Sequence, residues 1–438
     1  MKYKKYPKYK DSGVEWLGEI PNEWTNAKLK FYLNELIAGG TPKTDNIEFW
    51  AEFNEGIPWV SIADMTKNDL ILETKKNVTY KGISEKNLKI LPKGTLLYSI
   101  FASLGKVATA GVPLTTNQAI LGIVPNHKID KNYLYWLLIG LENYVKFSAN
   151  SNTQDNLNSE KVANFPISVP LLNDQQQIAN FLDNTTAKID TLIEKQTKQI
   201  ELLKEKRQAV ISHAVTKGIN PNVKMKDSGV EWLGEIPEHW EVKKLKYIST
   251  VNNESLSENF NEDFEINYID IGSVTTGNIN KFETMMYSSA PSRARRIVKN
   301  GDILISTVRT YLKAIAPISS TEDNFIVSTG FAVIRPNSMV ISAFMKYGLI
   351  SNYFIDLVEA SSVGISYPAI NSSDLITFKI VIPPLEEQQQ IANYLDDKTS
   401  KMDKLIEKAN KSIELLKEKR TALISAAVTG KIDVRELV

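Results

Sequence analysis

The chain is built from two halves that repeat each other. A twelve-residue motif, KDSGVEWLGEIP, occupies residues 10–21 and recurs unchanged at residues 226–237. Farther along, residues 175–216 align without a gap on residues 388–429, and 30 of the 42 aligned positions are identical. The copies are offset by 216 residues in the first pair and 213 in the second. We therefore predict a duplicated fold with two halves of nearly equal length, not a solenoid of short units.

The repeated 42-residue segments predict two long helices. Neither contains Gly or Pro, and Pro170 precedes the first copy while Gly218 follows it, as start and stop signals of a helix should. Each helix would be roughly 60 Å long at 1.5 Å per residue. Apolar residues recur at intervals of seven and predict a seam that a partner helix covers: Leu182, Ile189, Leu203, Val210, Leu395, Met402, Leu416 and Leu423, with Gln196 and Ala409 at intervening seam positions. The simplest partner is the other copy, and a coiled coil that merely dimerises the protein is the alternative.

The blocks between these helices predict mixed domains. Short runs rich in Ile, Val, Tyr and Thr alternate with Gly, Pro, Asn and Asp from about residue 29 to 165 and from 245 to 378, which is typical of strands and turns. One helix is expected in each block, at residues 132–144 and 342–357. The predicted fold is α+β and pseudo-two-fold, with two domains of mixed strands and small helices separated by two long antiparallel coiled-coil helices. Its segments are a basic N-terminal tail (1–9), a first domain (10–168), a first helix (169–218), a second domain (219–382) and a second helix (383–438).

The two blocks share a framework but not their loops. Lys93, Gly94, Ser99 and Lys106 approximately match Lys299, Gly301, Ser306 and Lys313, yet FASLGKVATAGVPLTTN bears little likeness to TVRTYLKAIAPISSTEDN. Drift after duplication would not explain why the helices and the motifs stayed alike in the same chain. Two surfaces with separate specificities would explain both.

Several classes of function are excluded or disfavoured by residue content. The chain has no Cys, which rules out disulfides, thiolate catalysis and zinc sites with sulfur ligands. We find no phosphate-binding, dinucleotide or adenosylmethionine-type glycine loop, and His127, His213 and His239 are scattered. The first residues lack the pattern of a signal peptide, and the longest apolar run, residues 133–141, is too short to span a bilayer. We therefore expect a cytoplasmic protein that makes no contact with membranes and binds no metal.

Two sets of polar residues are candidates for DNA contacts. Arg can neutralise phosphate or bridge two acceptors on a guanine edge, and neutral polar side chains suit base edges. The second block supplies Arg293, Arg295, Arg296, Arg309, Tyr311 and Lys313, and the first block supplies Ser103, Lys106, Asn117 and Gln118. Polar loops at residues 153–158 and 366–371 are further candidates. The alternative for the arginines at 293–296 is a charged surface stabilised by local ion pairs.

The order of these elements resembles the DNA-specificity (S) subunit of Type I restriction-modification systems. The resemblance covers essentially the whole chain and rests on the two DSGVEWLGEIP motifs, the helix openings PLLNDQQQIANFLD and PPLEEQQQIANYLD, and the helix ends ELLKEKRQAVISHAVT and ELLKEKRTALISAAVTGKI. It implies a non-catalytic subunit whose two target-recognition domains each read one half of an asymmetric, interrupted site in double-stranded DNA.

The same resemblance implies partners and a division of labour. The two helices would set the spacing and dock two methyltransferase subunits, and restriction subunits would join in the full complex. S-adenosylmethionine would be bound by the methyltransferase subunits, and this chain would hold no cofactor. The net charge of only +1 fits a chain whose partners supply much of the grip on phosphate.

Two other hypotheses compete with this one. A structural coiled-coil adaptor would leave methylation targets unchanged after exchange of residues 30–160. A nuclease would use Asp69, Glu73 and Lys75 with a divalent metal, although the other half has no such set and a solvated strand end explains these residues more simply.

Overall fold

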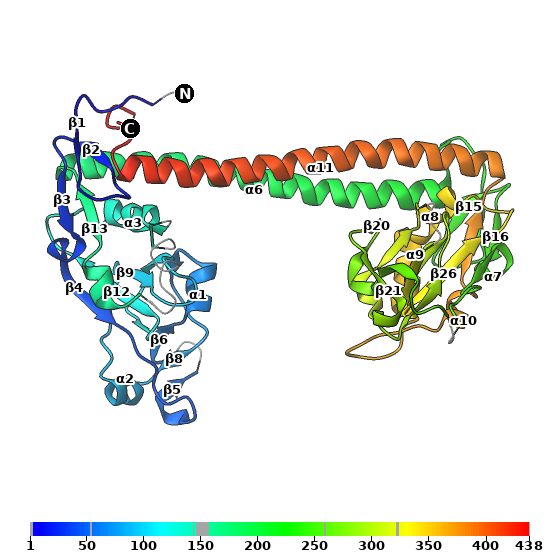
Figure 1. The fold of residues 1–438 in the computed structure, drawn as a ribbon, viewed down its shortest axis with the longest axis horizontal. Coiled ribbons are helices and arrows are strands. Elements are labelled where there is room, and N and C mark those ends of the chain that lie inside the picture. Colours follow the sequence, from blue (N-terminus) through cyan, green and yellow to red (C-terminus); the bar gives the residue numbers. More distant parts are fainter. Residues whose placement is uncertain are drawn as a thin grey trace. The chain divides into compact units, whose positions relative to one another are not determined.

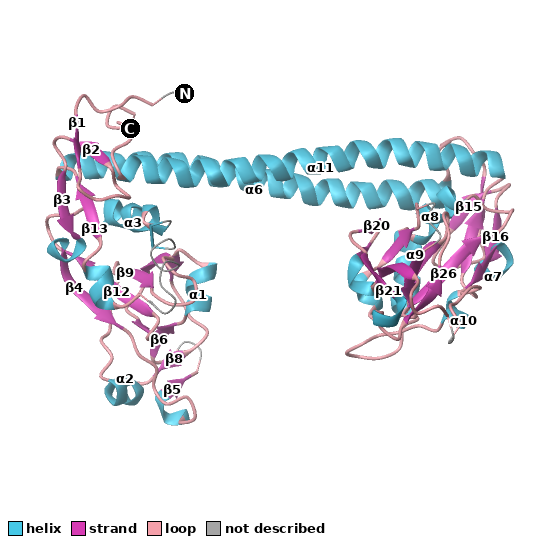
Figure 2. Ribbon diagram, in the orientation of Figure 1, coloured by secondary structure: helices cyan, strands magenta, loops and turns pink. Residues whose placement is uncertain are grey.

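The computed structural model describes residues 3–52, 55–142, 144–145, 157–257, 260–320 and 324–437. The chain divides into two compact units, unit 1 with residues 1–196 and 411–438 and unit 2 with residues 197–410. Each unit contains one strand-rich domain and part of both long helices, as Figures 1 and 2 show. The predicted α+β fold with two mixed domains and two long helices is confirmed.

The long helices are α6 (Leu172–Lys217) and α11 (Leu385–Val428), of 46 and 44 residues. In unit 1 the Arg420 side chain on α11 donates to Asp190 Oδ1 on α6 at 2.9 Å, and Arg435, just beyond α11, donates to Asp174 at 3.3 Å. A later residue of α11 thus meets an earlier residue of α6, so the helices pack antiparallel in this unit. In unit 2, Arg207 on α6 lies 3.2 Å from Asp403 on α11.

The seam residues are covered to different degrees. Leu182, Ile189, Leu395, Met402 and Leu423 are buried, and Leu203, Val210 and Leu416 are half-buried. The buried ones at positions 182, 189 and 423 belong to the same hydrophobic cluster as the core of the first domain, and Leu395 belongs to that of the second. The helices therefore supply part of each domain core as well as their own interface.

In unit 1 two sheets form the first domain, with strand orders β4-β12-β9-β10-β7 and β11-β6-β8-β5. The strands are β4 (Leu33–Ala38), β5 (Trp50–Ala51), β6 (Ile57–Val60), β7 (Leu70–Ile71), β8 (Asn77–Val78), β9 (Leu96–Ser99), β10 (Val107–Ala110), β11 (Thr115–Thr116) and β12 (Ile120–Pro125). Two antiparallel pairs, β1 (Tyr9–Asp11) with β2 (Glu19–Pro21) and β3 (Thr25–Lys28) with β13 (Pro166–Val169), join the domain to the helices. The small helices are α1 (Ile62–Lys67), α2 (Tyr80–Lys86), α3 (Lys131–Gly140) and α5 (Ser159–Ala163).

Unit 2 repeats the central part of this plan, with strand orders β17-β26-β23-β24 and β21-β18-β25-β22. The strands are β17 (Ser249–Val251), β18 (Glu265–Ile269), β21 (Glu283–Met286), β22 (Ala294–Ile297), β23 (Ile303–Ser306), β24 (Ile315–Pro317), β25 (Phe325–Ser328) and β26 (Phe331–Pro336). The pairs are β14 (Met225–Asp227) with β15 (Glu235–Pro237), β16 (Glu241–Lys244) with β27 (Lys379–Ile382), and β19 (Val274–Thr275) with β20 (Asn278–Ile279). The helices are α7 (Leu245–Ile248), α8 (Ser342–Leu349), α9 (Asn352–Ala360) and α10 (Ser372–Leu375).

The expected single helix at residues 342–357 is wrong in one respect, because the chain breaks there into α8 and α9. The Gln208 side chain on α6 donates to the carbonyl of Ile350 at 2.6 Å, and the Ser212 hydroxyl accepts from the backbone N–H of Asn352 at 2.9 Å. These bonds satisfy backbone groups that a continuous helix would pair internally. The other expected helix, at 132–144, is present as α3, which ends at Gly140, and residues 142, 144 and 145 are again helical after a turn at residue 141.

A lysine at the end of each long helix holds one copy of the twelve-residue motif. Lys431 Nζ donates to the carbonyls of Leu17 at 2.8 Å and Glu19 at 2.6 Å. Lys217 Nζ makes the equivalent bonds to the carbonyls of Leu233 and Glu235. The motif is thus fastened through backbone groups, which leaves most of its polar side chains exposed.

The two chain ends meet in unit 1 (Figure 1). Lys4 pairs with Glu436 at 2.7 Å and its carbonyl accepts from the backbone N–H of Asp433 at 2.8 Å. Tyr6, from the expected basic tail, is buried, and the Arg435 guanidinium lies 4.8 Å from its ring centre. Residues 3–9 are therefore part of the unit.

We predict that Leu395→Ala destabilises the chain much more than Leu405→Ala. Leu395 is fully buried against the second domain, whereas Leu405 on the same helix is about half exposed. Removing a buried leucine costs about 2–5 kcal/mol, and the exposed one should cost less than about 0.5 kcal/mol. Urea unfolding of the purified chain followed by circular dichroism measures both, and equal losses would contradict the shared core.

Candidate DNA interface

Two equivalent loops leave the central strands β9 and β23. They are residues 99–106, SIFASLGK, and residues 306–313, STVRTYLK. Each begins with a serine whose hydroxyl donates to the carbonyl two residues on, at 2.9 Å from Ser99 and 2.6 Å from Ser306. The fourth residue of each has a left-handed backbone, with φ of 63° at Ala102 and 52° at Arg309. The two loops therefore share this left-handed position, which presents Ala in unit 1 and Arg in unit 2.

In unit 2 this loop is joined to a second segment, residues 361–371. Val363 and Ala369 exchange both backbone hydrogen bonds, at 2.9 and 3.0 Å, and close a hairpin. The hairpin is tied to the loop by the bond from the Ile370 N–H to the Thr307 carbonyl at 2.9 Å and by the Thr310 hydroxyl on Ser362 Oγ at 2.8 Å. We call residues 306–313 and 361–371 together the Arg309 platform.

The Arg309 platform combines cations with exposed apolar groups. The Arg309 guanidinium lies 5.0 Å from the centre of the Tyr367 ring. Ile365, at the hairpin tip, is fully exposed, and residues 361–371 carry no charged side chain. Other exposed apolar side chains of the platform are Tyr311, Leu312, Val363 and Tyr367. An arginine on an aromatic ring beside apolar side chains is chemistry that suits nucleic-acid bases.

Of the other predicted cations of unit 2, Arg293, Arg295 and Lys313 have local partners, whereas Arg296 is partly buried. Arg293 donates to the Tyr268 hydroxyl at 3.2 Å and to Asp270 at 3.3 Å, and Arg295 donates to two backbone carbonyls, both at 3.3 Å. Arg296 is half-buried, and burial lowers the pKa of its guanidinium. Lys313 lies 3.6 Å from Glu359. Of the arginines at 293–296, Arg293 forms a local ion pair, with Asp270, and Lys313 outside that group is also paired.

Arg293 nevertheless shares an edge of the domain with the Arg309 platform. Its carbonyl accepts from the Thr329 N–H at 2.8 Å, and the next residue, Gly330, accepts from the Thr307 N–H at 2.8 Å. Arg295 and Arg296 lie away from this link: the Leu256 N–H donates to the carbonyl of Arg295, and Arg296 forms a β-bridge with Ser255. The structure therefore brings together Arg293, Arg309, Tyr311 and Lys313 of the six predicted residues.

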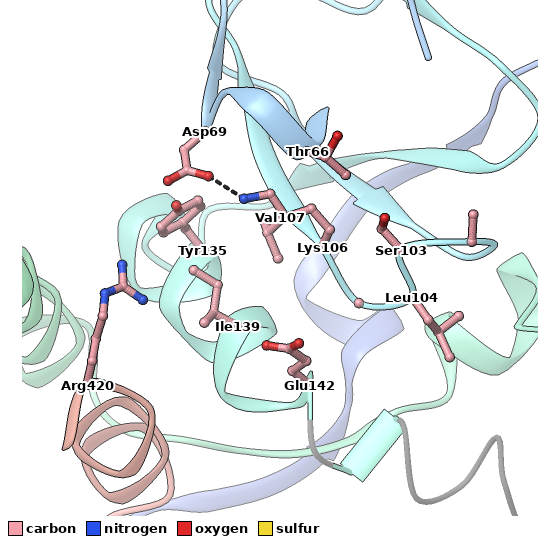
Figure 3. Close-up of a pocket in the computed structure, with 12 residues that line it drawn as sticks. Thr66, Asp69, Ser103, Leu104, Lys106, Val107, Tyr135, Ile139, Glu142 and Arg420 are labelled. Atoms are coloured by element: carbon pink, nitrogen blue, oxygen red, sulfur yellow. Dashed lines mark hydrogen bonds and ion pairs between the residues drawn. The ribbon is translucent and has the colours of Figure 1, made fainter. Parts of the chain in front are cut away.

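The four predicted residues of unit 1 divide between two places. Ser103 and Lys106 line a cleft of about 680 Å³ (Figure 3) that also includes Asp69, Tyr135 and Arg420. Lys106 Nζ pairs with Asp69 Oδ1 at 2.6 Å, and burial together with the Asp69 charge raises the pKa of Tyr135 to about 12. Tyr135 of α3 and Arg420 of α11 also line this cleft, so Ser103 and Lys106 lie on the side of the unit where the helices are.

Asn117 and Gln118 lie next to the glycine pair at residues 39–40. The Thr41 hydroxyl donates to Gln118 Oε1, and Asn117 Oδ1 accepts from the Ala119 N–H at 3.1 Å. A side chain at Gly39 would fall 2.2 Å from the Asn117 carbonyl oxygen, so glycine is required for this close approach. The Gln118 side chain is exposed, and its amide N–H groups are available as donors.

The loop at residues 366–371 is predicted from its polar residues, whereas nothing in the sequence predicts a role for Tyr367 or Ile365. Of the matching loop at 153–158, only residues 157 and 158 fall within the described residues.

The residues of the nuclease hypothesis do not form a metal site. Asp69 is paired with Lys106, and the backbone N–H of Lys75 donates to Asp64 at 3.3 Å. Over the described residues no group of three or more His, Asp or Glu side chains could hold a metal ion. In the same part of the chain, every helix is too short or too polar to cross a membrane.

Both the matching family and the matching relatives are proteins of Type I restriction specificity. The family described as the Type I restriction modification DNA specificity domain matches residues 21–202 and again residues 237–415. The Type I restriction enzyme MjaIX specificity subunit of Methanocaldococcus jannaschii is 27% identical over 448 aligned positions, which cover 100% of this chain and 99% of that protein. The putative MjaX specificity subunit of the same organism is 30% identical, with 96% of each chain covered.

Solved structures show the same fold. One is a chain from a structure that concerns complex assembly and conformational transition of the type I R-M system. It has a TM-score of 0.70 at 16% identity, and the match covers 93% of this chain and 98% of that one. The crystal structure of the HsdS subunit from Thermoanaerobacter tengcongensis has a TM-score of 0.52, also at 16% identity, with coverages of 94% and 98%.

We predict that Gly364→Ala opens the hairpin of the Arg309 platform without unfolding the unit. Gly364 has φ of 114°, and an added Cβ would lie 3.2 Å from the Tyr367 carbonyl oxygen. Such a conformation costs a residue with a side chain about 1–3 kcal/mol. Hydrogen exchange of the Val363 and Ala369 amides should become faster, while the global unfolding midpoint changes little. Unchanged exchange at both amides would show that the hairpin does not depend on this glycine.

Proposed function

The chain belongs to the Type I restriction modification DNA specificity family, and from this premise we infer that each of its two strand-rich domains reads one half of an asymmetric DNA site. Membership confirms the resemblance seen in the sequence, and the chain is a non-catalytic DNA-recognition subunit of a Type I restriction-modification system. The observation that carries the inference is the pair of equivalent loops, which present Ala102 and Arg309 at the same left-handed position. Like scaffolds with unlike side chains are suited to reading unlike half-sites.

We propose one recognition edge in each unit: the Arg309 platform with Arg293 in unit 2, and residues 117–118 in unit 1. Exposed donors and acceptors at these positions can meet base edges, whereas the paired Lys106 and Lys313 position the loops that carry them. Ser103 lies in the cleft and is assigned the same supporting role. Partner subunits would supply most of the electrostatic contacts with the DNA phosphates, because the net charge of this chain is only +1.

We propose that α6 and α11 set the number of base pairs between the half-sites. Both helices are uninterrupted, and the interhelical ion pairs Arg207–Asp403 and Asp190–Arg420 are equivalent in the sequence repeat. Two duplicated readers joined by a stiff element match half-sites at a defined separation. The spacing is then a mechanical property of the helices and independent of the bases that are read.

The function is tested by sequencing the methylated sites of cells that express this chain with its methyltransferase partner. The expected result is one bipartite, asymmetric motif with a constant gap. Inserting seven residues after Gln196 and seven after Ala409 keeps the seam in register and adds about 10 Å to each helix, or about three base pairs of duplex. We expect the gap to change, or methylation to be lost, while any motif that remains keeps both half-sites. An unchanged gap would refute the role of the helices, and a motif without two halves would refute the function.

We further propose that two methyltransferase subunits, each binding S-adenosylmethionine, dock on equivalent surfaces of the two repeats, and that restriction subunits join this complex for cleavage. The support is that apolar residues stay exposed at equivalent helix positions in both copies. The pairs are Leu172 with Leu385, Leu192 with Leu405 and Leu202 with Leu415. Exposed apolar side chains repeated in this way indicate a protein partner that is used twice.

Leu202→Asp and Leu415→Asp test this arrangement. Each single variant should lose one of two bound methyltransferase subunits, because a carboxylate would have to be buried unpaired in one interface, and the double variant should lose both. Native mass spectrometry of the reconstituted complex counts the subunits. Ile47→Asp, at an exposed apolar residue of the first domain, is the control and should retain both. Two subunits bound to the double variant would place the docking surface elsewhere.

A further inference from the structure

We propose that Arg309 reads a guanine in the half-site of the second domain and that Tyr367 is the positioning residue that fixes the plane of its guanidinium. The proposal rests on the proposed function and adds to it the base that is recognised and the two residues responsible. Two observations support it. The Arg309 side chain contacts the Tyr367 ring and makes no ion pair or hydrogen bond with the described residues, and the hairpin at residues 361–371 holds the loop that carries it.

Arg309 is available for an external ligand. Among the six candidate residues of unit 2, the other cations are engaged or half-buried, as at Arg293, Arg296 and Lys313. Arg309 is exposed, and its side chain makes no ion pair or hydrogen bond with any of the described residues. Its guanidinium makes a cation–π contact with the Tyr367 ring. An arginine with five unused donors at the end of a recognition loop is ready to bind a set of acceptors.

The contact of Arg309 with the face of Tyr367 suits a base better than a phosphate. Arginine stacks its planar guanidinium on aromatic faces, and in that arrangement its N–H edge stays free. A fixed planar edge matches the O6 and N7 acceptors of guanine, which arginine contacts in bidentate fashion in the major groove. A phosphate contact requires no such fixed plane, because phosphate offers acceptors in several directions. The fully exposed Ile365 nearby adds an apolar group of the kind that contacts base edges.

The backbone beneath Arg309 is built to hold this geometry. Arg309 and Lys313 both have left-handed backbones, with φ of 52° and 51°, at the two ends of the short turn Thr310–Leu312. Such conformations are unfavourable for residues with side chains and persist where surrounding bonds impose them. Here the bonds come from the hairpin, through Thr310 to Ser362 and through Ile370 to Thr307. Tyr367 belongs to the same hairpin, so the ring and the arginine are positioned by one set of contacts.

The first domain lacks this pair of arginine and tyrosine, because Ala102 occupies the equivalent left-handed position. The guanine contact is therefore expected in one half-site only. This asymmetry supplies an internal control, since any effect of Arg309 on affinity alone would weaken recognition of both halves together.

The experiment compares methylation by the complete complex containing wild-type, Arg309→Ala, Arg309→Lys, Tyr367→Ala or Tyr367→Phe chains. Arg309→Ala and Arg309→Lys should lose discrimination at one G·C pair of one half-site by roughly 5- to 150-fold, with every other position unchanged. Tyr367→Ala should lose part of the same discrimination, and Tyr367→Phe, which keeps the ring, should retain it. Lys281→Ala removes an exposed charge of the same unit that lies near Glu283, and it should leave the motif intact.

A chemical probe identifies the acceptor. Replacing the guanine at that position with 7-deazaguanine removes N7 and should slow methylation by the wild-type complex but not by the complex with Arg309→Ala. If Arg309→Ala weakens all sites equally and the motif is unchanged, Arg309 contacts phosphate and the proposal is overturned. If the wild-type complex yields no bipartite motif, the proposed function fails instead, so the two failures are distinguishable.

Discussion

The antiparallel packing of α6 on α11 is the contact on which the rest of the structure depends. Each unit takes the beginning of one long helix and the end of the other, and both contribute to the domain core, as Leu182 and Leu423 do in unit 1. The interhelical ion pairs are partly exposed and contribute little to stability by themselves. Burial of the apolar seam against both the partner helix and the domain supplies most of the stabilisation. Unit 1 is assembled from the first and the last parts of the sequence, and Lys4 contacts Glu436 and Asp433 there.

This construction separates scaffold from specificity. The serine-anchored loops, the left-handed residue at their fourth position and the lysine clamps on the twelve-residue motifs recur in both units. What differs is the side chain that each loop presents, and the hairpin of residues 361–371 that orients it in unit 2. A recognition surface built in this way can change its side chains without altering the core, since the anchoring contacts are made by backbone groups and short hydroxyl side chains.

How far the sequence predicted the candidate site varies with the residue. Arg309 is predicted because charge clusters are visible in a sequence, and Tyr311 because it is a polar residue beside that cluster; both lie on the Arg309 platform. Ser103 and Lys106 were grouped with Asn117, but they lie in the cleft beside α3 and α11, because a strand separates the two sets and turns their side chains to different places. Tyr367 was missed, since its role depends on the hairpin bringing residue 367 back to residue 309. No local pattern signals a contact across 58 positions.

By itself the sequence determined the duplication, the two long helices and the mixed character of the domains, because these follow from repetition and from apolar periodicity, which are local properties. Only the tertiary structure decided that each unit combines parts from both halves, that polar side chains of α6 divide one predicted helix into α8 and α9, and which arginine remains unpaired at the recognition edge. The reason is physical: the partner of a charge or of a backbone group is chosen by proximity in space, and proximity between distant segments is set by the packing of the whole core.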